Sequence, residues 1–153
     1  MHIKIQGGTK SQKKHVRSVV KFCAEMLMPR MSNINITIKL SSLKDAYGYC
    51  LSNDYDNPSR PREFEIEVEH KLKLRRLLET VCHEMVHVKQ YARGELYQSS
   101  INAKHRWQGK WLAKDPNYWD RPWEIEAHGR EAGLFIRWAE ANDLGGYAWT
   151  HDE

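Results

Sequence analysis

Two histidines and a glutamate at a fixed spacing are the most chemically informative feature of this sequence. The pentapeptide from His83 to His87 reads His-Glu-Met-Val-His, an H-E-x-x-H pattern with Glu84 next to the first histidine. Apolar residues recur around it at spacings of three and four, which predicts an amphipathic helix over about 70–93. On that helix the two imidazoles lie one turn apart on the same face and can bind one zinc ion. Glu84 is then placed to accept a proton from a zinc-bound water.

A catalytic zinc ion needs a third protein ligand and one position left open for water. A second apolar-periodic segment, with Pro122 in its first turn and Asp120 as the expected N-cap, predicts a helix over 122–142. Two glutamates of this helix lie two positions apart, so they point to roughly opposite sides and only one can reach the metal. The candidates for the third ligand are Glu124, Glu126, His105 and His128.

We favour Glu124 as the third ligand. It shares a helix face with the small Ala127, which would allow close packing against the histidine helix, and with His128 one turn on. Glu126 instead has Arg130 one turn on, a spacing typical of a solvent-exposed ion pair. A donor beyond the metal is also needed, either to orient the carboxylate or to stabilise an oxyanion. The candidates for that role are His128 and Tyr118.

Length and composition indicate one domain, residues 1–153, with a modest hydrophobic core. The formal net charge of +4 and the pI near 8.9 are only mildly basic, so they permit but do not require a nucleic-acid partner. Three cysteines without a C-x-x-C pair are typical of free thiols in a reducing compartment. The sequence contains neither a membrane span nor a signal peptide, so we expect a cytoplasmic protein.

The remaining patterns predict an α+β fold. A helix is predicted over 9–28, and a loop rich in Asn, Asp and Pro over 52–62. We expect a small mixed or antiparallel sheet packed on the first helix and the H-E-x-x-H helix, with the C-terminal helix carrying the third ligand. Alternating apolar residues predict the strands of that sheet at 2–6, 34–40, 47–51 and 63–69.

Three features have more than one interpretation. The strand at 63–69 has a wholly acidic face, which we interpret as protection against edge pairing and, alternatively, as a surface facing the substrate. The segment 95–121, with a tight turn expected at 106–111, carries aromatic residues that either fill a loop-rich core, the favoured interpretation, or form a wall of the substrate site. The first helix has a basic face, interpreted as solvated although it could contact phosphates, formed by Lys10, Lys13, Lys14, Arg17 and Lys21.

The H-E-M-V-H helix followed by Pro-Trp-Glu-Ile-Glu-Ala-His-Gly-Arg-Glu resembles the small zincin-like metallopeptidases of tailed bacteriophages. It also resembles the wider gluzincin group, in which a glutamate on a later helix completes the zinc site. Glu124 and Ala127 match that group's pattern, whereas His128 stands where Asp or Asn is usual, which keeps Glu126 as an alternative. SprT-like proteases are similar in layout and would use a third histidine, for which His105 is at a comparable distance. If the chain is phage-encoded, the resemblance implies the host cytoplasm.

These observations predict zinc-dependent hydrolysis of peptide bonds in a peptide or protein substrate. His83, His87 and Glu124 would bind Zn²⁺, and Glu84 would take the proton of the attacking water and pass it to the leaving amine. Two rival functions remain at this stage. One is a DNA-associated SprT-like protease, which the basic first helix suggests; the other is a non-catalytic zinc-binding module that retains the fold.

Overall fold

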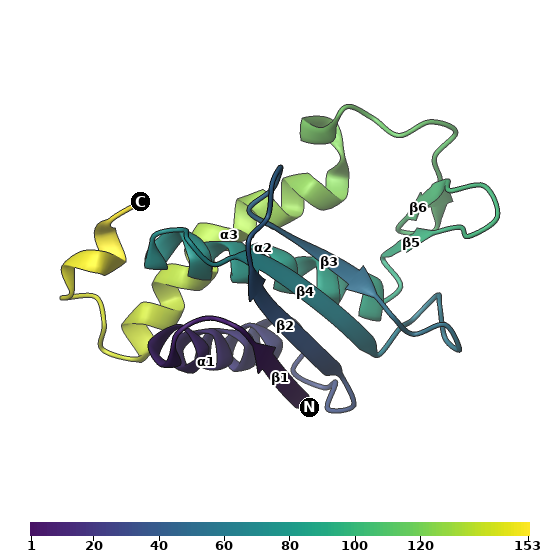
Figure 1. Ribbon diagram of the computed structural model, residues 1–153. Helices are drawn as coiled ribbons and strands as arrows, with labels where there is room; N and C mark the ends of the chain where they lie inside the picture. Colours follow the sequence, from purple (N-terminus) through teal and green to yellow (C-terminus); the bar gives the residue numbers. More distant parts are fainter.

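The first half of the chain forms a four-stranded mixed sheet. The computed structural model describes residues 1–153 and orders the strands β1–β2–β4–β3 (Figure 1). β1, β2 and β4 run parallel, and β3 pairs antiparallel with β4 at the edge of the sheet. The predicted α+β class is confirmed, with the sheet in its mixed form. The strands are β1 (His2–Gln6), β2 (Asn35–Ser41), β3 (Gly48–Ser52) and β4 (Glu63–Glu69).

One face of this sheet is buried and the other faces solvent. Ile36, Ile38 and Leu40 of β2 point into the core, while the residues between them are half-buried on the opposite face. The acidic face of β4 lies on that outer side, where Glu65 pairs with Lys39 of β2 at 3.1 Å. Because β4 lies between β2 and β3, the interpretation of its glutamates as protection of an exposed edge is wrong.

Three long helices are packed together on the buried side of the sheet (Figure 1). The helix α1 (Lys10–Leu27) begins at Thr9, whose side chain and that of Gln12 form a capping box. The helix α2 (Leu74–Ala92) contacts α1, α3 (Pro122–Ala141) and the sheet, so almost every residue from its second turn onward is buried. The five basic residues of α1 are exposed, in agreement with a solvated face.

The boundaries of α2 and α3 differ slightly from the prediction. α2 begins at Leu74 rather than 70 because the His70 N–H still donates to the carbonyl of Ser41 at the end of β2. Its C-terminal end lies where expected, since Gly94 adopts a φ of 72° that suits glycine in a helix C-cap. Asp120 is not the N-cap of α3, because it belongs to the short 3-10 helix η1 (Tyr118–Asp120).

The segment between α2 and α3 contains a small three-stranded sheet. β6 and β7 are joined by Gln108 and Gly109, which have φ values of 48° and 82° and form the predicted tight turn. The aromatic residues here do not fill a core: Trp111 is 53% exposed and Trp119 is 67% exposed. The strands are β5 (Leu96–Gln98), β6 (His105–Trp107) and β7 (Lys110–Trp111).

After α3 the chain ends in a second 3-10 helix, η2 (Ala148–His151), which packs on α2. Trp149 of η2 lies against Phe135 and Trp138 of α3. No helix of this fold has the length and apolar character needed to span a bilayer. Together with α1, α3 and the sheet, η2 surrounds α2, which is why most of its residues are buried.

Candidate metal centre

α2 places both histidines of the H-E-x-x-H pattern on one face, directed at α3. His83 and His87 are each 7% exposed, and their rings lie 4.9 Å apart between centroids. The leucines and valines of α2 occupy the remaining faces and belong to the core. The helix turn of 3.6 residues therefore brings the two imidazoles together, as the spacing predicts.

Glu124 of α3 completes a compact group of ligand atoms. The Nε2 atoms of His83 and His87 lie 3.2 Å apart, and each lies 3.2 Å from an oxygen of Glu124. Around a tetrahedral ion with bonds of roughly 2.0–2.2 Å, neighbouring ligand atoms stand about 3.3–3.6 Å apart. The spacing of these three side chains is therefore close to what a small divalent cation requires.

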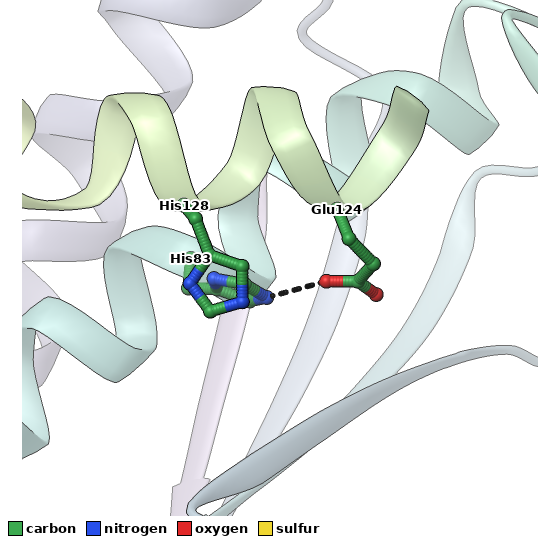
Figure 2. Close-up of side chains that lie close together, drawn as sticks. All are labelled: His83, Glu124 and His128. Atoms are coloured by element: carbon green, nitrogen blue, oxygen red, sulfur yellow. Dashed lines mark hydrogen bonds and ion pairs between the residues drawn. The ribbon is translucent and has the colours of Figure 1, made fainter. Parts of the chain in front are cut away.

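His128 lies next to this group and could also contribute a ligand. Figure 2 shows Glu124 and His128 projecting from one side of α3 toward His83, and ligand atoms of these three residues lie within 4.8 Å of one another. This His-Glu-His group could hold a metal ion. The group that includes His87 has the shorter separations between its ligand atoms, 3.2 Å.

Hydrogen bonds from outside the group fix how each imidazole is turned. Nδ1 of His87 lies 2.8 Å from Oε1 of Gln90, whose amide nitrogen donates to the Trp123 carbonyl and to Glu126. Nδ1 of His83 lies 2.8 Å from Oε2 of Glu131. Both Nδ1 atoms face acceptors and so carry a proton, which would leave the Nε2 atoms of both rings as the ones to bind a cation.

Glu126 belongs to this outer layer and is not the solvated residue that its pairing with Arg130 suggested. It does bond Arg130 at 3.0 Å, but it also accepts from the buried Lys89 at 2.6 Å and from Gln90 at 2.8 Å. Lys89 pairs as well with Glu95. Glu126 is thus linked to His87 only indirectly, by two hydrogen bonds through Gln90, and it does not contact the ligand atoms of His83, His87 and Glu124.

Opposite charges stabilise one another within the group when no ion is bound. Burial opposes protonation of His83, but hydrogen bonds to Glu124 and Glu131 outweigh it and raise the pKa of its imidazole to about 9. Burial likewise favours the neutral form of Glu124, but hydrogen bonds from His83 and His87 hold the pKa of its carboxyl well below the usual range. An incoming cation would therefore take the place of protons.

Glu84 is buried beside the group but takes no part in its hydrogen bonds. It is 4% exposed, lines the cavity, and forms no hydrogen bond or ion pair with another side chain. Burial is the main cause that raises the pKa of its carboxyl to about 6. Its carboxylate lies against Gly48 of β3, where an added Cβ would stand 3.3 Å from Oε1 of Glu84 and 2.8 Å from Thr80 Cγ2.

A cavity of about 720 Å³ opens over these residues, between α2, α3, β3 and η1. Tyr118 lies at its rim, where its hydroxyl donates to Oε2 of Glu124 at 3.0 Å and lies 3.0 Å from Nε2 of His128. Trp119 packs on His128 with ring centroids 5.0 Å apart, and it also lines the cavity. Tyr118 and Trp119 thus form part of the cavity wall; that this wall contacts a substrate stays a prediction.

His105, the remaining candidate ligand, lies outside the cavity. Its Nδ1 is 2.8 Å from Asp115, and its ring stacks on Trp123 at 4.8 Å between centroids. Its position between these two partners is that of a residue that anchors β6 to α3. The structure thus brings six of the predicted residues together around one cavity, and it separates His105 and Glu126 from them; the six are His83, Glu84, His87, Glu124, His128 and Tyr118.

Several residues of the site were not predicted from the sequence. Glu131 had a signal, because it follows Glu124 by seven positions and so shares its helix face. For Gln90, the only signal in the sequence was its position three residues after His87 on the same helix. The orientation of its amide depends on the Trp123 carbonyl, which belongs to another helix. Gly48 had none, because the need for glycine comes from the close approach of β3 to α2.

Comparisons with known proteins identify no relative of this chain. No protein-family model matches the chain, and searches of the curated proteins and of the solved structures also find no match. The resemblance to zincin-like metallopeptidases therefore stays a prediction from the sequence motifs.

Proposed function

We propose that this protein is a zinc-dependent peptidase in which His83, His87 and Glu124 hold the ion. Two imidazole nitrogens and a carboxylate oxygen form a ligand set that suits zinc, and three protein ligands leave a position for water. Zinc bound there would lower the pKa of its water and polarise the carbonyl of the scissile bond. The separations of 3.2 Å between the ligand atoms support this assignment.

The observation that carries the proposal is the free carboxylate of Glu84. In a structural metal site, a buried carboxyl group without a hydrogen-bond partner has no role. A hydrolytic site needs a base beside the metal-bound water. Glu84 lies in the cavity beside both histidines, and its pKa of about 6 is closer to neutrality than that of an ordinary glutamate. Glu84 accepts the proton of the attacking water and later returns it to the leaving amine.

His128 and Tyr118 supply the polar hydrogens nearest to the reaction centre. The Tyr118 hydroxyl now bonds Glu124, and His128 is held between Tyr118 and Glu131. Burial and the neighbouring carboxylates raise the pKa of Tyr118, so its phenol remains a donor at any working pH. We assign these two side chains to stabilising the negative charge that develops on the substrate carbonyl.

The edge strand β3 favours a peptide over other hydrolysable compounds. β3 pairs with β4 along one side only, so its other edge is free, and its residues Gly48 and Cys50 line the cavity. An extended peptide can add to such an edge through main-chain hydrogen bonds. The close packing of Gly48 on Glu84 would then bring the backbone of that peptide next to the base.

The test of this function is zinc content combined with cleavage of a peptide mixture. Protein purified without added metal is expected to contain close to one zinc per chain and to cut peptides in the mixture, as read by mass spectrometry. Dialysis against a chelator should abolish cleavage, and added Zn²⁺ should restore it. The proposal would be contradicted by protein that lacks zinc and cannot be loaded with it. It would also be contradicted by zinc-loaded protein that cuts no peptide in the mixture.

The non-catalytic module is a second candidate because His128 lies within reach of the same ligand atoms. If His128 were a fourth ligand, the site would be closed to water and typical of structural zinc. X-ray absorption spectroscopy of the zinc-loaded protein distinguishes the two cases. A peptidase should show zinc bound by two imidazoles and by oxygen ligands. A closed site should show three imidazoles, and adding a peptide should not change the spectrum of the unsubstituted protein.

We expect Gln90→Leu to weaken zinc binding by roughly 10–100-fold, because His87 loses the acceptor that fixes its ring. Glu131→Ala should have an effect of similar size through His83. Competition with a chromophoric chelator measures both constants. Glu140→Ala is the matched control, because it removes an exposed glutamate from the same helix as Glu131, and it should leave zinc affinity unaltered. Unchanged affinity in both variants would mean that the rings are held by packing alone.

A further inference from the structure

The cavity extends in two directions from the metal group, and its two ends differ in character. Beyond His87 it is lined by the apolar or aromatic side chains of Tyr91, Leu96 and Trp123. In the other direction, toward the N-terminal end of α2, it is lined by polar residues. Thr80 lies there against Gly48, and residues 45–47 and Arg76 also line this part of the cavity. The two ends therefore suit different parts of a substrate.

Arg76 is a cation without a partner at this polar end. It is half-buried, lines the cavity, and its guanidinium forms neither an ion pair nor a hydrogen bond. The adjacent Arg75 is fully engaged: it pairs with Glu79 at 3.0 Å, donates to the Thr150 carbonyl at 2.8 Å, and lies over the ring of Phe135. Of two consecutive arginines, one holds α2 to the rest of the fold and the other is left directed at the cavity.

The acidic residues nearest to this end do not neutralise Arg76. Asp45 lines the same wall but is exposed and not within 4.0 Å of the guanidinium. Glu131 is occupied by His83 at 2.8 Å and by His128 at 3.5 Å. A half-buried guanidinium that lacks a carboxylate of its own chain is suited to bind one from a ligand, by two parallel hydrogen bonds.

We propose that Arg76 binds a carboxylate of the substrate and so sets its specificity. This inference rests on the proposed peptidase function. Arg76 precedes His83 by seven residues, which is about 10 Å along a helix, and an extended peptide covers that length in about three residues. The ligand is thus a peptide with a carboxylate about three residues from the scissile bond, either an acidic side chain or the terminal carboxyl group.

The experiment uses short alanine–leucine peptides that carry Glu or Gln near the C-terminus and end in a free carboxylate or an amide. The parent enzyme should cut at least one carboxylate-bearing peptide better than its neutral counterpart. Arg76→Gln should reduce that preference in kcat/KM by roughly 10–100-fold, the usual effect of losing a hydrogen bond to a charged group. Arg60→Gln, which removes an exposed arginine outside the cavity, is the matched control and should keep the preference.

The two carboxylate sources give different results. Loss of the preference on amidation identifies the terminal carboxyl group, and loss on replacing Glu by Gln identifies the side chain. Arg76→Glu should invert the preference toward peptides with lysine at that position, a gain that a folding defect would not produce. An equal preference in the parent and Arg76→Gln would overturn the assignment.

A binding measurement separates failure of this inference from failure of the proposed function. Fluorescence anisotropy with zinc-loaded Glu84→Gln measures affinity for the same labelled peptides, and it requires no turnover. If no peptide is cut but carboxylate peptides bind more tightly, and lose 10–100-fold on adding Arg76→Gln, the peptidase proposal fails and the Arg76 site stands. If peptides are cut while binding ignores the carboxylate, the peptidase stands and the Arg76 site is rejected.

Discussion

Glu84→Gln is expected to abolish peptide hydrolysis while leaving the zinc in place. The amide keeps the shape of the side chain but cannot accept a proton from water, and loss of a positioned base typically lowers a rate by about 10²–10⁴-fold. The metal should remain, because Glu84 forms no bond to His83, His87 or Glu124. The measurements are kcat on the best substrate and zinc content by elemental analysis of the same sample.

The stability of the metal-free protein gives a second readout of the same substitution. A buried carboxyl whose pKa stands near 6 rather than 4.5 destabilises the fold by about 2 kcal/mol once it is ionised. This cost is absent below pH 4.5, grows between pH 4.5 and 6, and is complete above pH 6. Metal-free Glu84→Gln should therefore be more stable than the parent at pH 7–8 and equal to it near pH 4.5 by denaturant titration. In the kinetic measurement, hydrolysis by Glu84→Gln at the parental rate would show that Glu84 is not the base.

Glu124→Ala is expected to lose both zinc and activity. Its carboxylate oxygens lie 3.2 Å from Nε2 of each histidine, so the substitution removes one of the three proposed ligands. The loss of zinc affinity should exceed the roughly 10–100-fold expected for residues that only orient the ligands. Chelator competition on purified variants measures it, and circular dichroism should confirm that the fold is retained.

Glu126→Ala is the matched comparison, since it removes a glutamate two positions away on the same helix. It should lower zinc affinity by less than about 10-fold, because Gln90 keeps the Trp123 carbonyl as a second acceptor. It should also destabilise the protein by about 1–3 kcal/mol, because the buried Lys89 loses one of its two carboxylates. If Glu126→Ala were the variant that lost zinc, the ligand assignment on α3 would be wrong.

The local patterns of the sequence were sufficient to predict the elements and the central part of the site. Period-two and period-3.6 spacing predicted the four strands of the large sheet and the three long helices to within a few residues, because each of these elements buries one face; β5, η1 and η2 were not predicted. The turn of an α-helix alone places His83 and His87 together, so that pair requires no tertiary information. Glu124 was favoured over Glu126 from its small neighbour Ala127, which is fully buried where α3 packs on α2.

Other features depended on contacts between residues far apart in the chain. The acidic strand was misinterpreted because strand order is set by the crossover connections, and these place β4 inside the sheet. Glu126 was expected to be solvated because its spacing to Arg130 is local, whereas its partners Lys89 and Gln90 lie on another helix. His105 was left as a candidate until its packing on Trp123 placed it outside the cavity.

The sequence by itself determined which side chains could bind a metal and supply a base, since a single helix carries His83, Glu84 and His87 at fixed angles. Only the tertiary structure decided which carboxylate joins them, which groups turn the imidazoles, and which charges remain free. Those properties follow from the packing of α3 and β3 against α2, and packing is a relation between separate segments that no local spacing encodes. Arg75 and Arg76 are adjacent in sequence, yet packing engages one and leaves the other directed at the cavity.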